Sequence, residues 1–229
     1  MLRRFVGIGD TRELRNLARE RLGVQALRVA TGALLKRRCH VDLDKRHVLL
    51  GEQVGGGHDA GDQAGPLGFG PRRVAPPGIR FEDLPPIDLV LVSHNHYDHL
   101  DIAALRWLAR ERRPQIITTL GNRAWLERRG VTRVVELDWW QPLLAHPELS
   151  VICTPAQHFS GRWLNDRNQT LWCSYVVTGK KRLFFSGDSG YCSHFSAIGK
   201  KFGPFDLTLV PIGAFEPRKL MRPVHMDPE

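Results

Sequence analysis

One stretch, residues 87–101, decides how the rest of the chain is interpreted: Ile-Asp-Leu-Val-Leu-Val-Ser-His-Asn-His-Tyr-Asp-His-Leu-Asp. Its apolar part, from Ile87 to Val92, predicts a short buried strand that ends at Ser93. Apolar residues at helical spacing follow from Ile102 and predict a helix. The predicted order is therefore a strand, a polar loop and a helix.

The polar loop carries four potential metal ligands within six positions, namely His94, His96, Asp98 and His99. Imidazole nitrogens and carboxylate oxygens bind zinc at about 2.0–2.2 Å. In a loop at a strand end, His94 and His96 can point the same way while Asp98 and His99 turn towards a second point. This arrangement suits two metal ions close together. The alternative is a polar loop with incidental histidines, and four such residues after one buried strand argue against it.

Two further candidate ligands each follow a predicted strand. His158 comes after the strand 149–154, and Asp188 comes after the strand 182–186. Taken alone, His158 could be an incidental loop histidine and Asp188 a turn residue before Gly190. Strand ends at one edge of a sheet converge, however, so these positions and the first loop can build a single site. The order of predicted strands and helices indicates an α/β layered sandwich.

Composition places the chain among globular proteins of one domain. It has 229 residues, of which 42% are hydrophobic. No apolar run approaches the roughly 18 residues of a membrane span, and the N-terminus shows no export signal. Four cysteines without close-paired spacing are expected to be reduced thiols: Cys39, Cys153, Cys173 and Cys192. These features predict a cytoplasmic protein with no transmembrane segment, and they leave its oligomeric state open.

The net charge of +9 is unevenly distributed, because residues 1–80 carry most of the basic excess. Basic surface can attract nucleic acid or anionic lipid. Residues 11–38 are predicted to be helical, either as a basic amphipathic helix on a membrane surface or as an ordinary surface helix. Residues 51–70 are rich in glycine and predict a loop or disorder. Basic residues do not interleave with aromatic ones in a recognisable binding motif, so no nucleic-acid partner is expected.

The loop from His94 to His99 resembles that of the metallo-β-lactamase superfamily, which has this spacing and usually holds two zinc ions. Longer segments narrow the resemblance to the N-acyl-phosphatidylethanolamine-hydrolysing phospholipase D family. They are residues 94–101, 155–168, 184–191, 211–218 and 225–229. The resemblance runs from about Gly70 to Glu229. It implies an αββα sandwich of the metallo-β-lactamase type.

The resemblance also implies roles for individual residues. One zinc ion would be held by His94, His96 and His158, the second by Asp98 and His99, and Asp188 would bridge both. A hydroxide between two such cations is a nucleophile at neutral pH, which makes Asp98 and Asp188 the expected catalytic carboxylates. Tyr97 and His225 fall where the family contacts its lipid. Their alternatives are a loop aromatic residue and a surface histidine.

The activity implied is cleavage of the phosphodiester of N-acyl-phosphatidylethanolamine to give an N-acylethanolamine and phosphatidic acid. A phospholipid substrate at a membrane surface, reached by peripheral association, fits the basic N-terminal segment and four aromatic residues, Trp139, Trp140, Phe159 and Trp163. Two alternatives stay open. One is a hydrolase of another substrate, such as a lactone or a different phosphodiester. The other is an inactive fragment that only binds metal or membrane.

Two departures from the family define the predicted domain boundaries. Residues 1–69 are expected to form a divergent, partly helical or disordered region, and residues 39–69 look unlike folded protein of this class. A frame-shifted start would explain this, and the other reading frames of the gene would test it. The hydrolase domain, 70–229, is expected to lack its C-terminal end, with a histidine of the second metal site. Weaker binding of the second metal is therefore expected.

Overall fold

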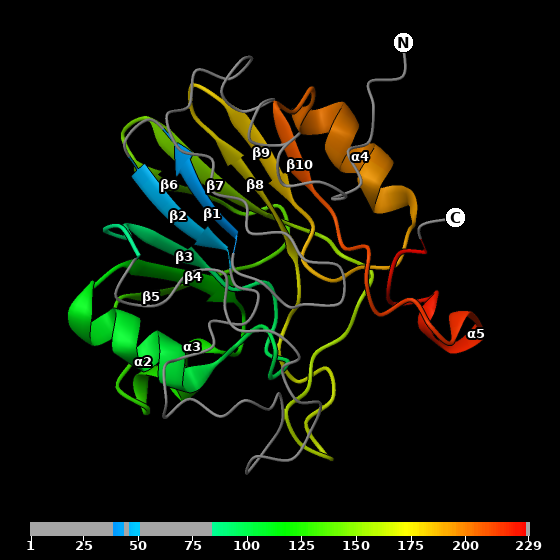
Figure 1. The fold of residues 1–229 in the computed structure, drawn as a ribbon, viewed down its shortest axis with the longest axis horizontal. Coiled ribbons are helices and arrows are strands. Elements are labelled where there is room, and N and C mark those ends of the chain that lie inside the picture. The colour runs from blue at the N-terminus through cyan, green and yellow to red at the C-terminus, as the bar shows by residue number, and fades with distance from the viewer. Residues whose placement is uncertain (1–38, 44–45, 51–83, 228–229) are drawn as a thin grey trace.

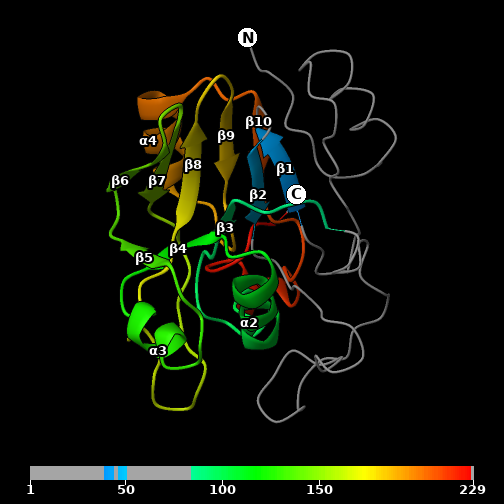
Figure 2. The same ribbon diagram turned by 90° about the vertical axis from the view of Figure 1, so that its left-hand side faces the viewer.

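Two five-stranded sheets lie face to face between layers of helices (Figure 1). The computed structural model describes residues 39–43, 46–50 and 84–227, and for the first two segments it describes the backbone alone. The predicted helix at 11–38 and the glycine-rich segment at 51–70 lie outside the described residues. Figure 2 shows the same layers from the side, with α4 above the sheets and α2 and α3 below them.

The first sheet has the strand order β1-β2-β3-β4-β5. Its strands are β1 (Cys39–Leu43), β2 (Arg46–Leu50), β3 (Leu89–Leu91), β4 (Gln115–Thr119) and β5 (Val134–Leu137). The pair β1 and β2 is antiparallel, and every other neighbouring pair is parallel. The order β10-β9-β8-β7-β6 forms the second sheet, which is antiparallel except for the pair β9 and β10. Its strands are β6 (Pro142–His146), β7 (Leu149–Thr154), β8 (Ser174–Thr178), β9 (Arg182–Phe185) and β10 (Leu207–Leu209).

Among the described residues, α2 (Ile102–Glu111) and α3 (Arg123–Glu127) cover the outer face of the first sheet, and α4 (Ser193–Phe202) covers that of the second. The short α5 (Arg218–Met221) lies near the C-terminus, away from both sheets (Figure 1), and buries none of its residues. The side chain of Asp101 begins α2 because it accepts hydrogen bonds from the backbone N–H groups of Ala103 and Ala104, at 2.9 and 3.1 Å. In the part of the chain that the structure describes, no helix is both long and apolar enough to cross a bilayer.

Alternating side chains divide the core into separate layers, because successive residues of a strand point to opposite faces. In β3, Leu89 and Leu91 enter the core between the two sheets, whereas Val90 faces the core under α2 and α3. On the second sheet, Val176 and Phe184 pack against α4 through a third cluster. The architecture is therefore an αββα sandwich, and the predicted α/β class is confirmed.

Several predicted elements are confirmed, and one expectation about the N-terminal part is wrong. The strand 149–154 has the predicted bounds, and the predicted helix from Ile102 is present. Residues 39–69 were not expected to contribute folded structure, yet β1 and β2 extend the first sheet, with β2 pairing in parallel with β3. The prediction missed these strands because each is only five residues long and a glycine-rich segment follows them.

Candidate metal centre

Three strand ends bring the predicted ligands to one edge of the sandwich. The loop 94–99 follows β3, His158 follows β7, and Asp188 follows β9. Because β7 and β9 are both antiparallel to β8, their carboxyl ends lie at the same edge. The sheets are linked beside this edge by the phenol of Tyr175, which donates a hydrogen bond to the carbonyl of Val92 at 3.0 Å.

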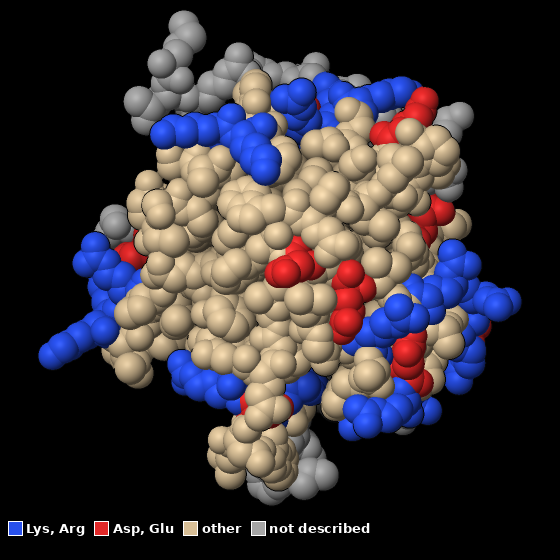
Figure 3. Space-filling view, turned by 180° about the vertical axis from the view of Figure 1, so that it is seen from behind, with Lys and Arg blue, Asp and Glu red and all other residues tan. Residues whose placement is uncertain are grey.

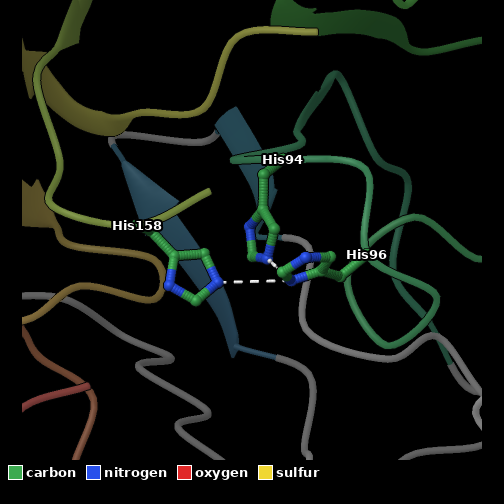
Figure 4. A group of neighbouring side chains, drawn as sticks. All are labelled: His94, His96 and His158. Carbon is green, nitrogen blue, oxygen red and sulfur yellow. Dashed lines mark hydrogen bonds between the residues drawn. The ribbon is translucent and has the colours of Figure 1, made fainter. Parts of the chain in front are cut away.

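Three imidazole rings converge as the first group of potential ligands (Figure 4). The Nε2 atom of His94 lies 2.8 Å from Nδ1 of His96, which lies 3.2 Å from Nε2 of His158. One ligand atom of each residue lies within 4.8 Å of the others. The structure therefore brings together the three residues that were predicted to share one metal ion.

The second group lies next to the first and includes a carboxylate. His94, His99 and Asp188 place ligand atoms within 4.8 Å of one another. The Nε2 atom of His99 is 3.0 Å from Oδ2 of Asp188, and Nε2 of His158 is 3.9 Å from the same oxygen. Asp98 lies at the edge of this group, with its carboxylate 3.7 Å from Nε2 of His99. Asp188 thus stands between the two groups, as a bridging ligand requires.

Burial keeps the imidazoles of His94, His96 and His158 neutral at pH 7. Burial lowers the pKa of His94 well below its ordinary value, and the neighbouring imidazoles lower it further. Mainly through burial, the pKa of His96 and that of His158 each fall to about 4. Burial alone raises the pKa of Asp188, but His99 and the other nearby imidazoles outweigh burial and hold this pKa well below its ordinary range. Neutral imidazoles beside an ionised carboxylate are the protonation states that bind a metal ion.

The hydrogen bonds of the histidines also fit a metal centre. The Nδ1 atom of His158 lies 2.9 Å from the carbonyl oxygen of Val224, so Nδ1 donates and Nε2 is left as the free nitrogen. The hydroxyl of Ser93 lies 3.0 Å from Nδ1 of His94. The other ring nitrogen of His94, Nε2, therefore faces His96 and His158. Partners on the outer nitrogen fix the orientation of metal-binding histidines in this way. The residues present therefore fit one or two metal ions.

A clamp formed by Arg162 holds the ligand loop from outside. Its guanidinium donates hydrogen bonds to the carbonyls of Asn95 and Leu100, both at 2.8 Å, and it lies over the ring of Tyr97 at 4.0 Å. The side chain of Asn95 accepts a hydrogen bond from the N–H of Gly161 at 2.7 Å. These bonds fasten the loop after β7 to the loop after β3. The sequence pattern did not indicate this role of Arg162, although the residue lies within the quoted segment 155–168.

His225 lies deeper in the site than the surface-histidine alternative implied. Only 8% of its surface is exposed, and its ring centroid is 5.1 Å from that of His158. It places a ligand atom within 4.8 Å of those of His158 and Asp188. Its Nδ1 atom is buried and has no hydrogen-bond partner among the described residues. Tyr97, by contrast, is half-buried beside the ligand loop.

Comparison with known proteins identifies the family. Residues 59–229 match the model of the beta-lactamase superfamily domain. The chain belongs to the beta-lactamase superfamily. The match begins before Gly70, where the quoted resemblance started, and it covers the whole candidate metal centre.

Proteins with similar sequences include one that is uncharacterised and one that is named for its activity. An uncharacterised protein of Mycobacterium tuberculosis is 47% identical over 163 residues, which are 70% of this chain and 43% of that protein. An N-acyl-phosphatidylethanolamine-hydrolysing phospholipase D of Caenorhabditis elegans is 40% identical over 172 residues, which are 70% of this chain and 48% of the relative. The chain thus spans less than half the length of either relative.

A solved structure of a metallo-hydrolase has a similar fold. The metallo-hydrolase Igni18 of Ignicoccus hospitalis aligns with a TM-score of 0.56 over 79% of this chain and 69% of that protein, at 20% identity. At this identity the comparison bears on the fold alone. The superfamily and the His/Asp groups together establish a metal-dependent hydrolase fold.

Proposed function

We propose that this protein is a phosphodiesterase of the phospholipase D type that hydrolyses N-acyl-phosphatidylethanolamine with the help of two zinc ions. The observation that carries the proposal is the position of Asp188 after β9, where its Oδ2 atom lies 3.0 Å from Nε2 of His99 and 3.9 Å from Nε2 of His158. The 40% identity with the phospholipase D of Caenorhabditis elegans supports this substrate over others. The expected products are an N-acylethanolamine and phosphatidic acid.

The metal ligands divide into two sets in this proposal. His94, His96 and His158 would hold one ion, Asp98 and His99 would hold the other, and Asp188 would contribute to both. When bound, two such ions neutralise charge on a phosphoryl oxygen and lower the pKa of the water between them. The carboxylates of Asp98 and Asp188 would thus be the catalytic acidic residues. We propose that the ion held by Asp98 and His99 binds more weakly than the other. The reason is that the Asp98 carboxylate lies outside the groups whose ligand atoms are within 4.8 Å of one another.

Two residues beside the ligands are proposed to contact the phospholipid. His225 has a buried ring nitrogen without a hydrogen-bond partner among the described residues, and it borders both His158 and Asp188. A nitrogen in this position is suited to donate a hydrogen bond to a phosphoryl oxygen. Tyr97 is held by the Arg162 guanidinium over its ring, so that the phenol sits at the rim of the ligand loop.

Exposed apolar residues near the site support a substrate that lies in a membrane surface. Trp163 is 60% exposed and Leu164 is 96% exposed, in the loop that begins after His158. Trp139 has a different role, since it packs against the core between the sheets and its indole donates to the carbonyl of Trp172. We therefore place the lipid contact at the loop 159–168 and not at Trp139.

We propose no nucleic-acid substrate for this protein. On the face seen in Figure 3, the described Lys and Arg residues lie mainly around the periphery, and the middle is mostly uncharged with a few acidic side chains. A continuous basic stripe is the usual electrostatic feature of nucleic-acid binding. The described part of this face shows none.

The deciding experiment measures metal content and lipid hydrolysis on the same preparation. Plasma mass spectrometry should find close to two zinc ions per chain, and His96→Ala should lose them. Vesicles of N-acyl-phosphatidylethanolamine should then yield N-acylethanolamine with the wild-type chain and not with the variant. If a lactone or a soluble phosphodiester is turned over instead, the superfamily assignment stands and the proposed substrate is wrong. If metal binds and no substrate is turned over, the chain is an inactive metal-binding unit.

A further inference from the structure

A chain of hydrogen-bonded groups outside the metal ligands joins Cys192, His194 and Ser189. The Sγ atom of Cys192 lies 2.7 Å from Nδ1 of His194, and Nε2 of His194 lies 3.2 Å from Oγ of Ser189. Ser189 is fully buried and His194 is 8% exposed, whereas Cys192 reaches partial exposure. The metal ligand sets described above include none of these three side chains.

The hydrogen-bond partners of Ser189 determine which group is the donor in each hydrogen bond of this chain of groups. The Ser189 hydroxyl donates its one hydrogen to the carbonyl of Gly190 at 2.7 Å, and it accepts from the backbone N–H of Gln157 at 3.0 Å. It must therefore accept from His194, so Nε2 of His194 carries the proton. Burial lowers the pKa of His194, which keeps the ring neutral, and Nδ1 then accepts from the thiol of Cys192. Every member of the chain is thus satisfied.

The chain connects the two loops that supply Asp188 and His158. Ser189 directly follows Asp188, and Gln157 directly precedes His158. A second bond ties the same loops, from the N–H of Gly190 to the carbonyl of Gln157 at 2.8 Å. These loops come from β9 and β7, which are not neighbours in the sheet, so their relative position depends on contacts beyond the strand pairing.

Helix α4 gives the chain a rigid base. Cys192 is the N-cap residue of α4 and His194 lies in its first turn. The helix packs on the outer face of the second sheet through Ile198, which is 1% exposed, within the cluster that includes Val176 and Phe184. A side chain on a packed helix holds its partner more closely than one on a free loop. The helix therefore sets the position of Ser189.

We propose that Cys192, His194 and Ser189 form a positioning network that holds the Asp188 and His158 loops in the geometry that binds metal. This inference rests on the proposed metal-binding function. His194 acts through Ser189 and touches no metal or substrate. Partners behind the direct ligands commonly change metal affinity by about 10–100-fold when they are removed. We expect an effect of that size here.

The first test is zinc affinity, measured by competition with a chromophoric chelator. His194→Ala and Ser189→Ala should weaken the affinity by about tenfold or more. His194→Gln keeps an N–H donor that can reach Ser189, and it should restore affinity to within about threefold of the wild type. The matched control is Ser196→Ala, at an exposed position of the same helix outside the network. If Ser196→Ala weakens zinc binding as much as His194→Ala, the network has no positioning role and the proposal is wrong.

The second test needs no metal and separates this inference from the proposed function. Amide hydrogen exchange in the metal-free protein should be faster at Gln157 in His194→Ala and Ser189→Ala, and unchanged in His194→Gln. Unchanged exchange at Gln157 in all variants would overturn the network. If exchange responds as expected but the wild-type chain binds no zinc, the proposed function fails while the positioning of the loops stands.

Discussion

The Nε2 atom of His99 lies 3.0 Å from Oδ2 of Asp188, although the two residues are 89 positions apart in the chain. Asp188 also lies 3.9 Å from Nε2 of His158, so its carboxylate contacts both ligand groups. A single carboxylate thus connects the loop after β3 with the loops of the second sheet.

Replacing Asp188 should abolish binding at both metal positions. Asp188→Asn keeps the size of the side chain and removes its negative charge. Both proposed metal positions then lose the carboxylate that they share. Removing a residue that only orients a metal ligand already lowers metal affinity by about 10–100-fold, so removing the ligand itself should lower the affinity at least as much. Plasma mass spectrometry of the purified chain measures the effect. Asp206→Asn, at a carboxylate next to β10, should keep the wild-type metal content, and equal loss in both variants would contradict the prediction.

Replacing His225 should separate substrate contact from metal binding. If His225 contacts the phosphate as proposed, His225→Ala keeps two zinc ions and lowers lipid hydrolysis by about 10²–10³-fold, the usual loss for a donor to a charged transition state. Metal content and turnover are measured on one preparation. His146→Ala, in β6 of the second sheet, is the control and should change neither. Loss of one zinc ion in His225→Ala would instead make His225 a metal ligand.

Acid should destabilise the metal-free protein in a defined pH range. The pKa of His158 is about 4 in the folded chain, and its ordinary value is 6.5. Above pH 6.5 the ring is neutral in both states. As the pH falls from 6.5 to 4, the unfolded chain takes up a proton that the folded chain does not, so the free energy of unfolding decreases. One such histidine lowers the free energy of unfolding by roughly 3 kcal/mol across this pH range.

Urea unfolding of the chelator-treated protein between pH 4 and pH 7 measures this slope. The variant His158→Gln has no titrating group at that position, so its stability should depend less on pH. The prediction is wrong if the wild type and the variant lose stability in parallel. Adding zinc should oppose the loss at the upper end of the range, because bound metal excludes the proton.

A side chain at Gly187 should damage both stability and metal binding. Gly187 has φ +58°, and a Cβ atom there would lie 2.7 Å from Cβ of Ser93 and 3.0 Å from its hydroxyl. Gly187→Ala therefore combines a strained backbone, about 1–3 kcal/mol, with a clash against the residue that orients His94. Thermal unfolding and zinc affinity should both decrease.

The matched control is Gly199→Ala in α4. At Gly199 a Cβ atom would meet nothing within 4 Å, and alanine stabilises a helix interior by up to about 1 kcal/mol relative to glycine. The two glycine replacements should therefore change the melting temperature in opposite directions. A Gly187→Ala variant with wild-type stability and wild-type zinc affinity would contradict the prediction.

Residue types and spacing alone predicted the class of the fold and which candidate ligands come together. The cluster from His94 to His99 could be interpreted without coordinates, because four ligands lie within six positions after one apolar run. His158 and Asp188 could be added because each follows a predicted strand, and strand ends share an edge. The bounds of β7 and of the start of α2 followed from apolar periodicity, which is a local property.

Only the tertiary structure decided how these residues meet. It placed Asp188 between two ligand groups, put Asp98 at their margin, and buried His225 beside them. It also revealed the Arg162 clamp, whose partners lie 62 and 67 positions away. Hydrogen bonds between distant loops leave no periodic pattern, because they depend on how two sheets pack and on which side chains then come within about 3 Å. Local sequence thus determines which residues are suited to bind metal, and packing determines which of them come together.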